Sequence, residues 1–91
     1  MKFLLIVSSE NSVQESLRMI LKEDFYLFQA KTGSEALMIM AQHPVDVLLL
    51  DTNLPDYKGL ALVEKVRGIS EAVPLVIISS TRAPRLIPGL E

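Results

Sequence analysis

The stretch VLLLDTNLPDYKG, residues 47–59, decides the fold that the sequence predicts. It begins with four consecutive aliphatic residues and changes at Asp51 to a polar segment rich in turn-forming residues. An unbroken aliphatic run is typical of a parallel strand that is buried on both faces of a sheet. Ligands of open parallel sheets bind at the carboxyl ends of the strands, so Asp51 and the residues after it are candidates for a functional site.

Other apolar runs lie on either side of this stretch. Residues 3–7 and 75–78 are apolar throughout and predict buried strands. The run at 45–50 is interrupted only by Asp46, which we place at the exposed start of its strand. Residues 25–30 are apolar at first but more polar toward their end than the other runs, a pattern that predicts an edge strand.

Helical patterns separate these strands. Ser12–Glu15 has the spacing of a capping box, with Ser12 as the N-cap of a first helix. Thr32–Glu35 predicts a second capped helix, which should end before Pro44 because proline disfavours helical geometry in the preceding residue. A third helix is predicted from about residue 58 to 67, with Gly68 beyond its end. The alternation of strands and helices predicts an α/β fold with a parallel sheet.

Composition narrows the possible function. The 91 residues are 49% hydrophobic, which is enough for one small domain with a thin core. A net charge of −2 with scattered basic residues argues against a nucleic-acid binder. The absence of cysteine excludes disulfides and thiol chemistry, and a single histidine cannot form a histidine-rich metal site. The run at 3–7 is too short for a signal peptide or a membrane span, so we expect a cytoplasmic protein without a membrane partner.

The polar segment after the aliphatic run resembles a known motif. Asp51-x-x-Leu54-Pro55-Asp56-x-x-Gly59 is similar to the phosphoacceptor loop of response-regulator receiver domains. Residues 33–37 resemble the second helix of that family, and residues 74–79 resemble its fourth strand. The resemblance covers residues 2 to about 81. It implies a flavodoxin-like, doubly wound parallel sheet with strand order 2-1-3-4 and a signalling role in a two-component phosphorelay, without enzymatic activity.

The resemblance also implies roles for individual residues. Asp51 would accept a phosphoryl group from a histidine kinase, and the Asn53 carbonyl would bind Mg²⁺. The hydroxyl of Ser79 would sense the phosphoryl group. This chemistry needs positioning and charge stabilisation more than covalent help from the protein.

The first departure from the family pattern concerns Mg²⁺. The family carries two acidic residues after its first strand, and this chain has Ser8 and Ser9 there. Each unit-charge pair at about 4 Å contributes roughly 4 kcal/mol before desolvation, at an effective dielectric constant of ~20. Mg²⁺ binding is therefore expected to be weak, with Asp51, Asn53 and the adjacent Glu10 as the remaining ligands.

The second departure concerns the end of the sequence. We interpret residues 1–81 as a partial receiver domain that lacks the family's fifth strand and last helices. Residues 82–91 contain two prolines and a glycine and predict an irregular tail, which cloning could have contributed. The uncovered apolar surfaces of the first and fourth strands predict homodimerisation, strand exchange, or further residues in the natural protein that would cover them.

Three functional hypotheses follow. The leading one is an atypical receiver that keeps Asp51, has a degraded metal pocket and acts by protein–protein interaction. The alternative is an ordinary phosphoacceptor receiver, in which Glu10 and water complete the metal site. A small flavodoxin-like enzyme or nucleotide binder is disfavoured, because residues 8–11 form no glycine-rich phosphate loop.

Overall fold

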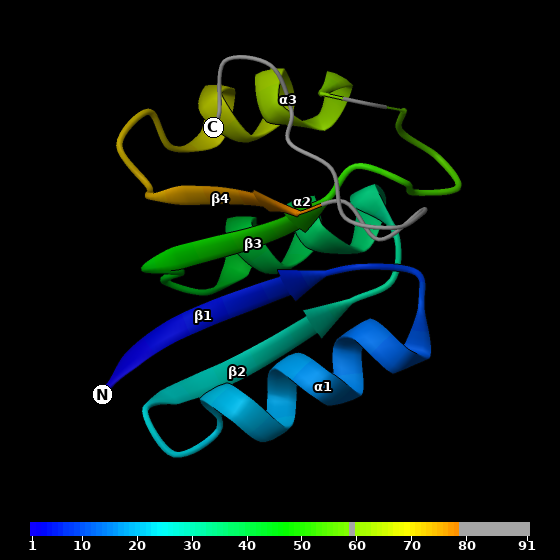
Figure 1. The fold of residues 1–91 in the computed structure, drawn as a ribbon. Coiled ribbons are helices and arrows are strands. Elements are labelled where there is room, and N and C mark those ends of the chain that lie inside the picture. The colour runs from blue at the N-terminus through cyan, green and yellow to red at the C-terminus, as the bar shows by residue number, and fades with distance from the viewer. Residues whose placement is uncertain (59, 79–91) are drawn as a thin grey trace.

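Seven elements alternate along the chain in a computed structural model that describes residues 1–58 and 60–78. Each strand is an aliphatic or aromatic run, and each helix follows a polar turn (Figure 1). In chain order the elements are β1 Lys2–Val7, α1 Asn11–Leu21, β2 Phe25–Ala30, α2 Gly33–Gln42, β3 Val47–Asp51, α3 Ala61–Ile69 and β4 Leu75–Ile78.

The four strands form one parallel sheet with the order β2-β1-β3-β4, and their arrows point the same way in Figure 1. This confirms the predicted flavodoxin-like sheet and the edge position of β2. The register pairs Val7 of β1 with Ala30 of β2 and with Leu50 of β3. The carboxyl ends of these strands therefore meet at one edge, which brings the residues after β1 close to the end of β3.

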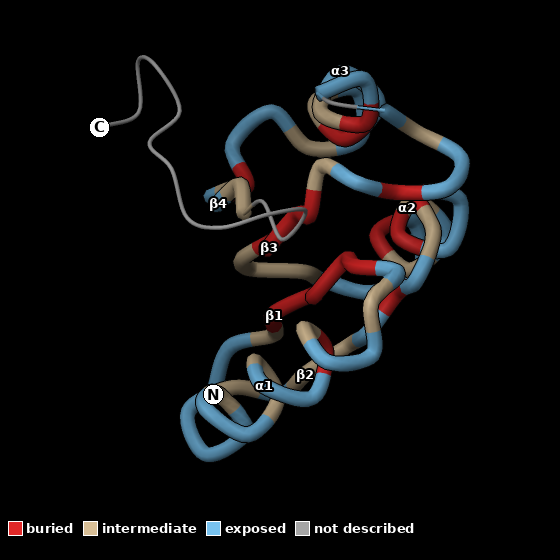
Figure 2. The backbone as a smooth tube through the Cα atoms, turned by 45° about the vertical axis from the view of Figure 1, so that its right-hand side comes forward, coloured by how far each residue is buried: buried red, intermediate tan, exposed pale blue. Residues whose placement is uncertain are grey.

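The helices cover the two faces of the sheet unequally. One face packs against α2 and α3 and contains most of the buried core, with Leu5, Leu48 and Leu50 fully buried. The other face packs against α1 around Leu4 and Ile6. Figure 2 shows the buried segments concentrated in β1 and β3, between the layers of helices.

β4 is the edge strand on the side opposite β2. Val76 pairs with Leu49, so its side chain is on the face that packs against α1. Because α1 packs on β1 and β2, Val76 is 48% exposed within the described part of the chain.

Three predicted helix boundaries were wrong, one in α1 and two in α3. α1 begins at Asn11, so Ser12 lies inside the helix and does not cap it. The backbone amide of Gln14 already donates to the backbone carbonyl of Glu10, because the chain turns directly after Ser8. The predicted partner of Ser12, Glu15, instead forms an ion pair with Arg18 at 3.2 Å.

The third helix begins at Ala61, because the backbone of Lys58 pairs in an isolated bridge with Asn53. It also continues through Gly68 to Ile69. The Arg67 guanidinium donates to the carbonyls of residues 70, 71 and 73 and so holds the chain that leaves the helix.

The second helix agrees with its predicted boundaries. Thr32 is its N-cap, and its Oγ1 accepts a hydrogen bond from the Glu35 amide at 3.1 Å. The helix ends at Gln42, before Pro44.

Some predictions fall outside the described residues. The role of Ser79, the domain boundary at residue 81 and the irregular tail at 82–91 lie there and stay predictions. Across residues 1–58 and 60–78, no helix has the length and apolar content that crossing a membrane requires.

Candidate functional site

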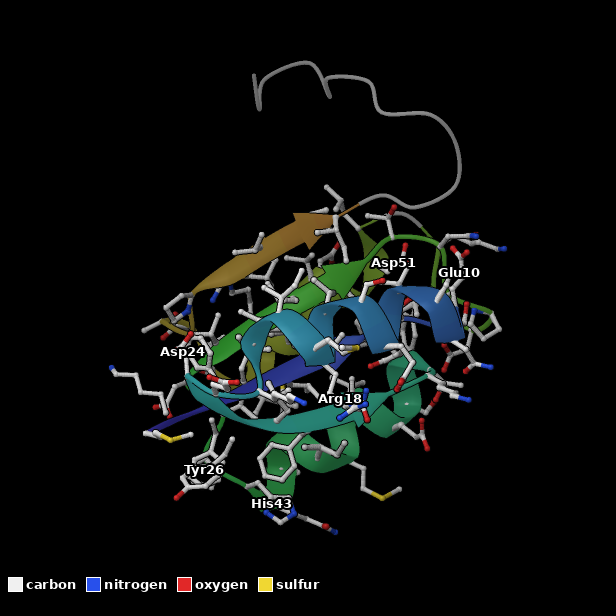
Figure 3. The ribbon with its side chains drawn as sticks, turned by 60° about the horizontal axis from the view of Figure 1, so that its bottom comes forward. Glu10, Arg18, Asp24, Tyr26, His43 and Asp51 are labelled. Carbon is white, nitrogen blue, oxygen red and sulfur yellow. The ribbon has the colours of Figure 1, made fainter. Side chains whose placement is uncertain are left out.

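The candidate site lies where β1 and β3 end at the same edge of the sheet. Asp51 is the last residue of β3, and its side chain is completely buried. Ser8 follows β1, is also completely buried, and donates from Oγ to Asp51 Oδ2 at 2.9 Å. Figure 3 shows Asp51 and Glu10 at this end of the sheet. The structure therefore brings the predicted acceptor into contact with the first of the two predicted replacements.

The second serine contacts a different part of the same loop. The hydroxyl of Ser9 donates to the backbone carbonyl of Asn53 at 3.3 Å. The backbone amide of Asn53 in turn donates to Asp51 Oδ1 at 2.9 Å. Ser8, Ser9, Asp51 and Asn53 thus form one connected hydrogen-bond network, as the spacing of the predicted strand ends requires.

The Mg²⁺ site implied by the resemblance can be tested against these atoms. Both carboxylate oxygens of Asp51 accept a hydrogen bond, and the Asn53 carbonyl accepts one from Ser9. Among residues 1–58 and 60–78, no three histidine, cysteine, aspartate or glutamate residues gather as a metal would require. Mg²⁺ binds through carboxylates and retained water, so a network that offers it one carboxylate, Asp51, and one carbonyl, Asn53, is a poor fit for the ion.

Gln14 is part of the site and was missed by the sequence analysis. Its side chain is 4% exposed, and its Nε2 donates to the carbonyls of Ile6, Ser8 and Ala30 at 3.2, 3.0 and 2.9 Å. Its Oε1 accepts from Gln29 at 3.0 Å. Gln14 therefore ties the ends of β1 and β2 together and fixes the backbone of Ser8 beneath Asp51.

Asp56 connects the loop after β3 to the start of α2. Its carboxylate accepts hydrogen bonds from the amides of Gly33 and Ser34 at 2.8 and 2.9 Å, and from the Ser34 hydroxyl at 3.0 Å. These bonds, that to the Gly33 amide above all, hold the pKa of Asp56 below its ordinary value. From the loop after β3, Asp56 therefore satisfies free backbone amides at the start of α2.

This contact makes stability depend on pH. Because the pKa of Asp56 is lowered by folding, its contribution is present above the unfolded value of ~3.9 and is lost as pH falls through the lower folded value. We expect Asp56→Asn to be less stable than the wild type at pH 7, with the difference shrinking below about pH 4. Urea unfolding at neutral and acidic pH measures both differences.

The matched control is Asp24→Asn, since Figure 3 places Asp24 at the far end of the sheet from Asp51. If the free energies of unfolding of wild type and Asp56→Asn differed by the same amount at neutral and acidic pH, the contact of Asp56 with the start of α2 would be contradicted.

The fold and the strand-end site define an open parallel α/β domain with a buried carboxylate at the carboxyl edge of its sheet, and the comparisons with known proteins identify its family. The family model of the response regulator receiver domain matches residues 4–88. The chain belongs to this receiver-domain family of two-component systems.

Curated relatives of the chain are regulatory proteins. The transcriptional regulatory protein KdpE of Mycobacterium tuberculosis is 33% identical over the whole chain, which covers 41% of KdpE. The response regulator MprA of the same species is 32% identical over 85% of the chain, which covers 34% of MprA. The chain thus spans about two fifths or less of the length of these relatives.

Solved structures agree with this assignment. A CheY-like receiver protein from Methanospirillum hungatei superposes with a TM-score of 0.83 and 25% identity, over 91% of this chain and 67% of that one. TrrA of Thermotoga maritima, solved with Mg²⁺ and BeF, superposes with a TM-score of 0.80 and 26% identity. The match covers 87% of this chain and 70% of TrrA. A chain from the structure of TrrA in complex with the histidine kinase ThkA superposes with a TM-score of 0.81 and 25% identity. This match covers 97% of the present chain and 77% of the matched chain.

Proposed function

We propose that this chain is an atypical, cytoplasmic receiver module without enzymatic activity. It keeps Asp51 at the acceptor position and transmits signals by protein–protein interaction, with weak or no Mg²⁺-dependent phosphorylation. One observation carries the proposal: the buried carboxylate of Asp51 faces the neutral hydroxyl of Ser8, at the position where the family pattern has an acidic residue.

The physical argument concerns the charge of the transferred group. Phosphoryl transfer relies on positive charge that neutralises the phosphoryl oxygens as they move. Asp51 and the Asn53 carbonyl offer a cation one carboxylate and one dipole, and hydrogen bonds already engage both groups. A phosphodonor would also have to expose Asp51, which is completely buried. Each of these requirements slows phosphorylation.

The proposed partner is a histidine kinase or another signalling protein. The complex of TrrA with ThkA supports this class of partner, because the backbone of this chain matches a chain of that complex. Homodimerisation through the β4 edge, where Val76 is exposed, remains a prediction that sedimentation would test.

Incubation with acetyl phosphate and Mg²⁺, followed by mass spectrometry, tests the proposal. We expect little or no aspartyl phosphate on the wild type above the background of Asp51→Asn, and little or no increase when Mg²⁺ replaces EDTA. Strong labelling of Asp51 that requires Mg²⁺ would favour the alternative, an ordinary phosphoacceptor receiver with Glu10 and water completing the metal site.

A further inference from the structure

We propose that the hydroxyl groups of Ser8 and Ser9 replace the cation as the link between the two loops of the site. We call the hydrogen bonds Ser8 Oγ–Asp51 Oδ2 and Ser9 Oγ–Asn53 O the hydroxyl clamp. The clamp engages the two groups that the resemblance assigns to the metal, the Asp51 carboxylate and the Asn53 carbonyl, at 2.9 and 3.3 Å. The inference rests on the proposed function in taking those two groups as the family's cation ligands.

The position of Ser8 is fixed on every side. Its amide donates to the Ala30 carbonyl at 2.9 Å, and its carbonyl accepts from Gln14 at 3.0 Å. Its Oγ accepts from the Glu10 amide at 3.2 Å, which directs the hydroxyl proton toward Asp51. A serine held by four hydrogen bonds is preorganised, so donating to Asp51 costs little side-chain entropy.

The chemistry of the clamp differs from that of a cation in one respect. A divalent ion attracts several oxygen atoms at once and leaves when it is chelated. A hydroxyl proton satisfies one lone pair and belongs to the covalent chain. The loop after β1 should therefore keep its position beside Asp51 whether or not Mg²⁺ is present, so metal cannot regulate the arrangement of this site.

Thermal unfolding in EDTA and in millimolar Mg²⁺ tests the clamp without any phosphodonor. The wild type should melt at the same temperature in both. Ser8→Ala should melt lower by roughly 5–10 °C in both, because a buried carboxylate loses its donor. The exposed Ser16 on α1 provides the matched control, and Ser16→Ala should melt like the wild type. Equal melting of Ser8→Ala and wild type in EDTA would overturn the clamp.

Acidic residues at positions 8 and 9 should make the melting temperature depend on Mg²⁺. The double variant Ser8→Asp/Ser9→Asp places carboxylates against Asp51, so it should melt below the wild type in EDTA and recover in Mg²⁺. A wild type that gains as much stability from Mg²⁺ as this variant does would also overturn the clamp.

A double-mutant cycle identifies the partner of the hydroxyl. Ser8→Ala should lower the melting temperature much less in an Asp51→Ala background, because the acceptor is already gone. An equal decrease in both backgrounds would place the effect elsewhere and reject the clamp.

Ser9→Ala serves as a second variant if Ser8→Ala does not fold, since Ser9 is exposed. It should shift the carbon resonance of the Asn53 carbonyl, and an unchanged resonance would reject that half of the clamp. Labelling of Asp51 by acetyl phosphate would refute the proposed function while leaving these melting results to decide the clamp.

Discussion

Gln14→Glu should lower the free energy of unfolding by about 3–5 kcal/mol, although it exchanges only an amide nitrogen for an oxygen. The nitrogen donates to three backbone carbonyls, and the side chain is 4% exposed. Each buried carbonyl left without a donor costs about 1–3 kcal/mol. The Ala30 carbonyl keeps its bond from the Ser8 amide, and Ile6 lies within the β1–β2 ladder, so the unpaired Ser8 carbonyl and the burial of a new carboxylate carry most of this loss.

The new carboxylate gives this prediction a pH signature. A glutamate facing carbonyl oxygens has its pKa raised in the folded state, so the variant is relatively more stable below the unfolded value of ~4.3 and weakens as pH rises. Chemical unfolding should therefore show that Gln14→Glu loses less free energy of unfolding, relative to the wild type, at about pH 4 than at about pH 7. Gln42→Glu at the exposed end of α2 is the control and should cost less than about 1 kcal/mol. A deficit for Gln14→Glu that matches this control would show that the three bonds contribute little.

The role of Gln14 illustrates what a sequence pattern cannot reveal. Apolar runs identified all four strands, and the continuous aliphatic character of β1 and β3 reflects their burial on both faces of the sheet. The same rule placed Asp51 near Ser8, since parallel strands that pair in register end together. Gln14 has no comparable signal. Its importance comes from the carbonyls of Ile6, Ser8 and Ala30, which lie in β1, directly after β1 and at the end of β2 and converge only when the sheet forms.

Helix starts show the same distinction between local and tertiary causes. The Thr32 cap was predictable because its partner, Glu35, lies three residues along the chain. The start of α1 instead follows a turn in which Ser8 Oγ accepts from the Glu10 backbone amide and donates to Asp51, a contact across 43 positions in the sequence. The link from Asp56 to Gly33 similarly requires the loop after β3 to pass over the start of α2, which no local motif records.

Gly33→Ala should lower the free energy of unfolding by about 2–4 kcal/mol, because the position has no room for a side chain. A β-carbon there would overlap the ring of Tyr57, which belongs to the loop that follows Asp51. Overpacking of this kind typically costs about 1–3 kcal/mol. Displacing the loop would also weaken the hydrogen bonds from Gly33 and Ser34 to Asp56. Chemical unfolding measures the loss, and amide chemical shifts of the loop should report its displacement.

Gly68→Ala provides a matched control within the same chain. Gly68 lies in α3, and a β-carbon there meets no atom within 4 Å. Alanine is the better helix former, so this variant should gain about 0.5–1 kcal/mol. Tyr57→Leu should also rescue part of the Gly33→Ala deficit, since a smaller side chain can move away from the new methyl group. If the two glycine variants changed stability in the same direction, or Tyr57→Leu gave no rescue, contact between α2 and the acceptor loop would not be the reason for glycine at position 33.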